Sequence, residues 1–217
     1  MEIFFPDYCA MCKKLGEKWC ATCKAQFLDY RPALSIEDRV PFPLWYYADY
    51  SAGFDTLIKS YKSAGRTDLV PFLSVALART IEAIIAKSAL QKIILVPMPS
   101  TKHRVKTRGY DHISLVAKAA TKLIQNFDER VVFVPALKQS NKTAQASVNA
   151  NNRKWNVHHT MWVSTGKERE LKHLPNAQII LIDDICTTGA TLIEGARALK
   201  SVGISVSGAA VLATVCK

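Results

Sequence analysis

Short runs of consecutive apolar residues recur along the chain at residues 93–96, 131–134 and 179–182. Such runs, with no polar side, are typical of central strands that are covered on both faces in a parallel sheet. An aromatic run at residues 44–50 is also strand-like. Stretches with helical spacing separate these runs. The pattern therefore predicts an α/β fold, in which helices flank a mostly parallel sheet.

The spacing of apolar residues predicts three of these helices. Residues 54–61 form the first, and residues 68–87 form a longer one in which Asp68 is a suitable N-cap. A third helix begins near Thr191 and ends before Gly203, which supplies a C-terminal stop.

The most informative stretch follows the apolar run 179–182. Asp183 and Asp184 come next, where we expect the strand to end, and a turn of small residues leads into the predicted helix: Thr187, Thr188, Gly189, Ala190 and Thr191. A helix start presents backbone N–H groups and positive dipole charge, so this turn suits a phosphate. The two carboxylates repel phosphate, but they suit ribose hydroxyls or a magnesium ion held through its water shell. Together these features indicate a site for a phosphorylated sugar.

This motif resembles the phosphoribosyl pyrophosphate (PRPP) signature of type I phosphoribosyltransferases. The resemblance implies the fold of that family and a catalytic role for Asp183 and Asp184, which would hold the ribose 2′ and 3′ hydroxyls. The turn at residues 187–191 would hold the 5′-phosphate. An ordinary strand-to-helix crossover would not need two aspartates beside Thr-Thr-Gly. A dehalogenase-type nucleophile would require a carboxylate at Ile185, and a Walker A loop would require Gly-Lys-Ser/Thr, which the chain lacks.

A second cluster of polar residues follows the apolar run 93–96. Pro97-Met98-Pro99 leads into a loop that is rich in basic side chains, and we take four of its residues as candidate pyrophosphate ligands: Ser100, Lys102, Arg104 and Arg108. By themselves these residues fit a solvated surface loop equally well.

The segment from Val96 to Tyr110 also resembles a block of the ComF/GntX family, phosphoribosyltransferase-like proteins associated with DNA uptake in natural competence. This resemblance favours the pyrophosphate role of the loop. Thr143 with Gln145 and Arg153 with Asn156 resemble further family elements, and so do the four N-terminal cysteines described below. Asp111-His112 departs from the family, which has Asn-Gln at this position, so substrate contacts are not carried over there.

Four of the six cysteines lie near the N-terminus in two Cys-x-x-Cys units: Cys9, Cys12, Cys20 and Cys23. Four thiolates complete the tetrahedron that zinc prefers and leave no open position for catalysis, so we expect a structural zinc in a small ribbon-like module. The alternatives are two disulfides, which a cytoplasmic setting disfavours, or unrelated buried thiols. We expect Cys186 to pack in the core, beside the phosphate turn.

Length and composition fit one α/β domain with a small appendage. We expect a zinc-binding module and linker at residues 1–38 and a phosphoribosyltransferase-like domain at residues 39–217, with residues 24–43 forming a proline-containing linker or irregular wrap. A net charge of +11 favours anionic partners. No membrane span or signal segment is evident, which predicts a cytoplasmic protein.

Polar residues 136–156 occupy the place where type I phosphoribosyltransferases carry a mobile loop that closes over PRPP, and we expect the same of this segment. His158-His159, just beyond it, is a poor metal site because adjacent side chains of a strand point to opposite faces.

Two functions follow from these features. The first is phosphoribosyl transfer from PRPP with release of pyrophosphate and with Mg²⁺ as cofactor, in a protein linked to DNA uptake. The second is a non-catalytic competence factor that binds single-stranded DNA and competence DNA-processing proteins, with a regulatory PRPP pocket. The aromatic run near Trp45 and the neighbouring lysines could stack and bind a single strand, although packing of this run in the core is the favoured interpretation.

Overall fold

The computed structural model describes residues 8–35, 39–51, 53–88, 91–140, 160–174 and 176–215. Within these ranges the main sheet contains six strands in the order β1-β2-β8-β7-β3-β4. Their bounds are Ala33–Leu34 for β1, Leu44–Asp49 for β2, Ile93–Pro97 for β3, Val131–Phe133 for β4, Gln178–Cys186 for β7 and Gly208–Thr214 for β8. All neighbours are parallel except β1, which pairs antiparallel with β2. The predicted parallel α/β sheet is confirmed.

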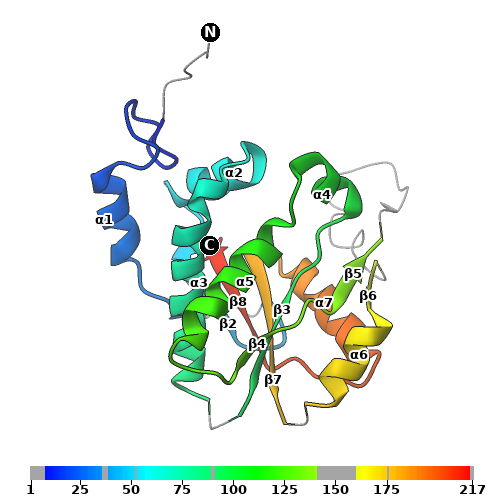
Figure 1. Cartoon of the computed structure of the whole chain (residues 1–217). Coiled ribbons are helices and arrows are strands. Elements are labelled where there is room, and N and C mark those ends of the chain that lie inside the picture. The colour runs from blue at the N-terminus through cyan, green and yellow to red at the C-terminus, as the bar shows by residue number, and fades with distance from the viewer. Residues whose placement is uncertain are drawn as a thin grey trace.

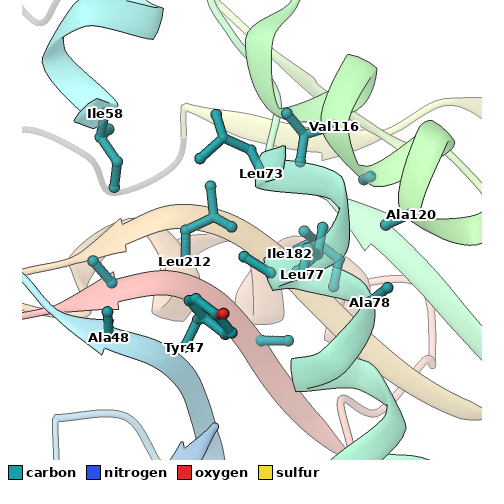
Figure 2. Close-up of a cluster of buried hydrophobic side chains, with 14 of the residues drawn as sticks. Tyr47, Ala48, Ile58, Leu73, Leu77, Ala78, Val116, Ala120, Ile182 and Leu212 are labelled. Atoms are coloured by element: carbon teal, nitrogen blue, oxygen red, sulfur yellow. The ribbon is translucent and has the colours of Figure 1, made fainter. Parts of the chain in front are cut away.

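Helices cover both faces of this sheet (Figure 1). The helices are α1 Ala21–Asp29, α2 Phe54–Ser63, α3 Val70–Ile85, α4 Lys102–Arg108, α5 His112–Gln125, α6 Thr165–Lys172 and α7 Ala190–Lys200. Helices α3 and α5 pack on one face, where Leu73, Leu77 and Val116 meet Ile182 and Leu212 of the sheet (Figure 2). Helix α7 packs on the other face, where Leu192 and Leu199 join a second core. A small antiparallel pair, β5 Leu137–Gln139 and β6 Met161–Val163, lies beside α7.

The strand containing the acidic pair is longer than predicted. We expected it to end before Asp183, but β7 runs on to Cys186 and pairs with β8 through Asp183↔Val211 and Ile185↔Ala213. Both aspartates therefore stand on a regular strand, with side chains on opposite faces.

Two other local predictions were wrong. The segment 24–43 is not an irregular linker throughout, because α1 extends to Asp29 and β1 pairs with β2. The long helix begins at Val70 rather than after Asp68. Asp68 lies in the 3₁₀ turn η1, Thr67–Leu69, and its carboxylate accepts from both Nε and Nη2 of Arg66 instead of capping the helix.

Several predicted features lie outside the described residues. These are most of the polar segment 136–156 together with Thr143, Gln145, Arg153, Asn156, His158 and His159. The described start of that segment forms β5. No helix in the described ranges is long and apolar enough to cross a membrane.

Candidate functional site

The two candidate anion-binding segments leave the sheet at the same edge. Strands β3 and β7 are hydrogen-bonded neighbours that pair up to Pro97↔Ile182, and the backbone N–H of Met98 donates to the carbonyl of Ile182 over 2.8 Å. Because both strands are parallel, the segment after β3 starts beside Asp183 and Asp184. Loops at the carboxyl ends of adjacent parallel strands are the usual ligand sites of such sheets.

Asp184 is buried, with 6 % of its surface exposed, and two basic side chains contact it. Its Oδ2 lies 2.6 Å from Nζ of Lys62 on α2 and 2.5 Å from Nε2 of His112 on α5. Burial alone would raise the pKa of this carboxyl, but the His112 hydrogen bond and the Lys62 charge hold the pKa below its usual value. Asp184 is therefore a carboxylate with its charge compensated inside the protein.

Asp183 has a different environment on the other face of β7. Its side chain is half-buried, and its Oδ1 accepts a hydrogen bond of 2.9 Å from the backbone N–H of Asp184. Burial, followed by repulsion from Asp184, raises the pKa of Asp183 to about 8. Adjacent aspartates thus have opposite tendencies, one to lose its proton and one to keep it.

His112 connects the acidic pair to the segment after β3. Its Nδ1 lies 3.1 Å from Nη1 of Arg108 and 3.2 Å from Oγ of Ser100, whose hydroxyl donates to Asp111 over 3.1 Å. A guanidinium can only donate, so the Arg108 contact favours the tautomer of His112 in which Nδ1 accepts and Nε2 carries the proton that faces Asp184. Two of the four predicted pyrophosphate residues, Ser100 and Arg108, are thereby joined to Asp184 through His112.

The other two, Lys102 and Arg104, lie on the exposed surface of α4. The basic segment forms this short helix rather than the expected loop, capped by Thr101, whose hydroxyl accepts from the backbone of Arg104 over 3.3 Å. None of its side chains is buried. Within the described ranges no hydrogen bond or ion pair joins Lys102 or Arg104 to the acidic pair, so they do not belong to the cluster.

The turn between β7 and α7 has the form expected of an anion site. Thr187 and Thr188 are exposed, and the hydroxyl of Thr188 accepts from the backbone of Ala190 over 3.4 Å. Gly189 has φ +75°, and a Cβ there would stand 2.6 Å from the carbonyl oxygen of Arg39. Glycine is therefore required both by the backbone conformation and by the approach of the segment that precedes β2.

Sequence reasoning missed three residues of this site. Lys62 lies far from β7 in sequence, and His112 appeared only as a departure from a family pattern. Arg39 donates to the carbonyl of Thr187 over 2.5 Å and to that of Val215, which places a guanidinium at the phosphate turn. No pattern in the sequence indicates that α2 lies close to β7, so the sequence could not reveal Lys62 as a site residue.

Comparison with known proteins finds a family match in the part of the chain that carries this turn. Residues 114–216 match the phosphoribosyl transferase domain family. No curated protein matches the sequence. The match covers most of α5, β7, the turn, α7 and β8, and with the parallel sheet it confirms the predicted phosphoribosyltransferase-like fold class.

The acidic pair does not fit a directly bound magnesium ion. Mg²⁺ needs oxygen ligands in near-ideal octahedral geometry. Here Oδ2 of Asp184 is held by Lys62 and His112, and the raised pKa of Asp183 favours its neutral form. Two hydrogen-bond donors at Asp184 and a carboxyl whose neutral form is favoured make a poor ligand set for Mg²⁺.

The four N-terminal cysteines, in contrast, converge as predicted. All four are free thiols, and their sulfurs lie within 4.8 Å of one another. Sγ of Cys12 is 3.8 Å from Sγ of Cys20, close to the edge of a tetrahedron built from Zn–S bonds of about 2.3 Å and far beyond a disulfide of about 2.0 Å. The cluster could therefore hold a metal such as zinc.

The protonation of this cluster also fits a metal. Burial opposes ionisation of Cys9, but backbone N–H groups, led by that of Cys20, lower the pKa of Cys9 to about 6. Burial and the neighbouring thiols raise the pKa of Cys23. Ionisation is thus favoured at Cys9 and opposed at Cys23, and a bound cation would remove that conflict.

The cysteine module packs tightly against the α/β body. The Trp19 ring packs at a tilt against Phe72 with ring centroids 4.0 Å apart, and the Phe27 ring lies parallel to that of Phe54 at 5.9 Å. Nζ of Lys13 donates to Oγ of Ser60 over 2.7 Å, two residues before Lys62. The module therefore shares its core with α2 and α3, next to the candidate site.

Proposed function

We propose that this protein binds PRPP and transfers its phosphoribosyl group to an acceptor with release of pyrophosphate. The observation that carries the proposal is the β7–α7 unit, in which an acidic pair adjoins an exposed Thr-Thr-Gly turn at a helix start, inside the region that matches the phosphoribosyl transferase domain family. A phosphorylated ribose has the hydroxyls and the phosphate that these two halves suit.

Different residues of the site would bind different parts of PRPP. Asp183 and Asp184 would take ribose hydroxyls, Asp184 through its second oxygen, and residues 187–191 would take the 5′-phosphate. Ser100 and Arg108 would face the pyrophosphate, with Lys102 and Arg104 at its outer side. Mg²⁺ would accompany the pyrophosphate of PRPP rather than the acidic pair. The protein would act by orientation and charge stabilisation, with no covalent nucleophile.

Calorimetric titration of PRPP into the protein tests this proposal. Thr191→Val removes a hydroxyl at the start of α7 and should weaken PRPP binding about tenfold, the loss of one hydrogen bond to a charged group. Thr165→Val is the matched control, because Thr165 is an exposed threonine at the start of α6. Pyrophosphate release with candidate bases and amines then tests turnover. Undetectable binding of PRPP by the unaltered protein would exclude the proposal.

A second candidate function is binding of single-stranded DNA by a competence factor. The observation that favours it is α4, which exposes Lys102, Arg104 and Lys106 beside the site. The aromatic run is less suitable for base stacking. Tyr47 is 1 % exposed and its hydroxyl donates to the carbonyl of Phe27, so this residue packs in the core. The Nζ of Lys87 lies over the Trp45 ring, 4.6 Å from its centroid.

Fluorescence anisotropy with labelled single-stranded DNA across a salt series tests this function. Binding should weaken steeply with salt because phosphate contacts release counterions. Changing Lys102 and Lys106 to Ala should reduce the dependence of affinity on salt concentration by the amount expected for the loss of about two phosphate contacts. The control changes Lys118 and Lys122, which are exposed on α5, to Ala, so that both double variants have the same net charge. Equal slopes for both double variants would exclude α4 as the DNA surface.

We also propose that the cysteine cluster binds one structural zinc. Four thiolate ligands leave no open coordination position, so the ion would stabilise residues 1–38 rather than take part in chemistry. The division into a zinc module and a domain at residues 39–217 belongs to this proposal. Thiols that ligate a metal must stay reduced, which favours a cytoplasmic location.

A further inference from the structure

We propose that Lys62 is the built-in counter-cation of the acidic pair, so that ribose hydroxyls bind there without a divalent metal. This inference rests on the proposed binding of PRPP. Lys62 is the last basic residue of α2, and its Nζ lies 2.6 Å from Oδ2 of Asp184. The side chains of the pair are 24 % and 8 % exposed, so water screens the contact only partly.

Hydrogen bonds hold the two residues that precede Lys62. The hydroxyl of Tyr61 donates to the carbonyl of His112 over 2.7 Å, and the hydroxyl of Tyr110 donates to the carbonyl of Tyr61 over 2.7 Å. One residue earlier, Ser60 donates to Ala10 and accepts from Lys13 of the cysteine module. These contacts hold the end of α2 against the start of α5, which leaves the ammonium group of Lys62 a short, defined reach to Asp184.

Charge accounting at the pair supports the same conclusion. His112 contributes a hydrogen bond from Nε2, since the Arg108 guanidinium beside its Nδ1 favours that tautomer. Asp184 is ionised, and the raised pKa of Asp183 favours its protonated form near neutral pH. Lys62 therefore balances the single carboxylate charge, which is the task that a divalent ion would otherwise perform beside an acidic pair.

Ribose 5-phosphate is the probe that isolates this feature. It carries the ribose hydroxyls and the 5′-phosphate but no pyrophosphate, so a need for Mg²⁺ cannot come from a pyrophosphate group. The unaltered protein should bind it with affinities that agree within about twofold in EDTA and in millimolar Mg²⁺. Lys62→Met should lose about tenfold in EDTA and recover part of that loss with Mg²⁺, because two adjacent carboxyls then lack a cation.

Lys59→Met is the matched control. Lys59 lies on the same helix, carries the same charge and pairs with Asp55, but its side chain is 64 % exposed and it does not contact Asp184. Its affinity should match that of the unaltered protein, and Lys62→Arg should retain most of the affinity in EDTA. Melting temperatures of all variants identify any loss of folding.

Two results would overturn the inference while leaving PRPP binding intact. One is binding of ribose 5-phosphate by the unaltered protein only when Mg²⁺ is present. The other is equal affinity and equal Mg²⁺ dependence for Lys62→Met and Lys59→Met. Failure of the unaltered protein to bind either PRPP or ribose 5-phosphate in any buffer overturns the proposed function and this inference together.

Discussion

Nε2 of His112 lies 2.5 Å from Oδ2 of Asp184 and ties the start of α5 to the carboxyl end of β7. On its other side, Nδ1 faces Arg108, which cannot accept a hydrogen bond. The Arg108 contact therefore favours the imidazole tautomer with its proton on Nε2. The ring of His112 therefore fixes the carboxylate of Asp184 and the guanidinium of Arg108 relative to each other.

The first prediction concerns this tautomer. Nitrogen-15 NMR of labelled histidines should show the proton of His112 on Nε2. His173 provides an internal control of opposite type, because its Nδ1 lies 2.7 Å from the carbonyl of Arg169 and must donate. His112→Gln and His173→Gln assign the two signals. A proton on Nδ1 of His112 would contradict the arrangement described here.

The second prediction concerns the ion pair of Lys62 and Asp184. A double-mutant cycle of Lys62→Met and Asp184→Asn, measured by urea denaturation, should give a coupling energy of about 1–2 kcal/mol. Asp184→Asn alone should lower the free energy of unfolding by about 2 kcal/mol, less than for a fully buried pair because water reaches Lys62.

The exposed pair of Lys59 and Asp55 is the control for that cycle. The two residues are four positions apart on α2, and a pair of this kind contributes only about 0.3–0.5 kcal/mol. Similar coupling energies in both cycles would show that burial of Asp184 adds nothing to its interaction with Lys62.

The third prediction concerns pH. The pKa of Asp183 is raised to about 8 in the folded protein, against roughly 3.9 for an unfolded aspartate. Between these values the folded state binds the extra proton, so this residue makes the free energy of unfolding fall as pH rises. Asp183→Asn removes the titration. We would measure the free energy of unfolding of both proteins at about pH 5 and about pH 8.5. The difference between the variant and the unaltered protein should shift in favour of the variant at the higher pH. An equal difference at both pH values would contradict the shifted pKa.

The fourth prediction concerns the phosphate turn. Gly189→Ala should destabilise the protein by about 1–3 kcal/mol, because φ is +75° and the new Cβ would meet the Arg39 carbonyl. Gly166→Ala is the control. Gly166 lies in α6 with open space around it, and alanine there should be neutral or stabilising by up to about 1 kcal/mol. Thermal melts of the two variants distinguish strain at the turn from a general effect of alanine.

The parts of the fold that could be predicted are those that apolar periodicity encodes. The run 179–182 predicted β7, and residues 54–61 predicted α2. The prediction failed where partners distant in sequence decide the outcome. Strand β7 continues through two aspartates because β8 pairs with it and because His112 and Lys62 compensate Asp184.

Local signals also competed with one another. Asp68 looked like an N-cap, but Arg66 binds its carboxylate, while Pro71 in the first turn marked the true helix start at Val70. Helix α1 was missed because it buries only Cys23 and Phe27, too few residues for a clear helical pattern. The cysteine spacing predicted the sulfur cluster, since two Cys-x-x-Cys turns aimed at one ion constrain geometry without help from the rest of the chain.

The last prediction concerns metal removal. Metal analysis of the purified protein should give about one zinc per chain, and a chelator should remove it. Because Trp19 packs on Phe72 and Phe27 packs on Phe54, loss of the cysteine module should also weaken the α/β body. Calorimetry should therefore show one transition that shifts to lower temperature, by about 2–4 °C for each kcal/mol of lost packing.

Ser60→Ala offers a milder version of the same perturbation. It removes the contact with Lys13 while leaving all four cysteines in place, so zinc content should stay unchanged and the melting temperature should fall by only a few degrees. Two separate transitions, with the larger one unaffected by the chelator, would mean that the module is energetically independent. The buried contacts of Trp19 and Phe27 would then contribute nothing to the stability of α2, and the support that α2 gives to Lys62 would have to come from Tyr61 and Tyr110 alone.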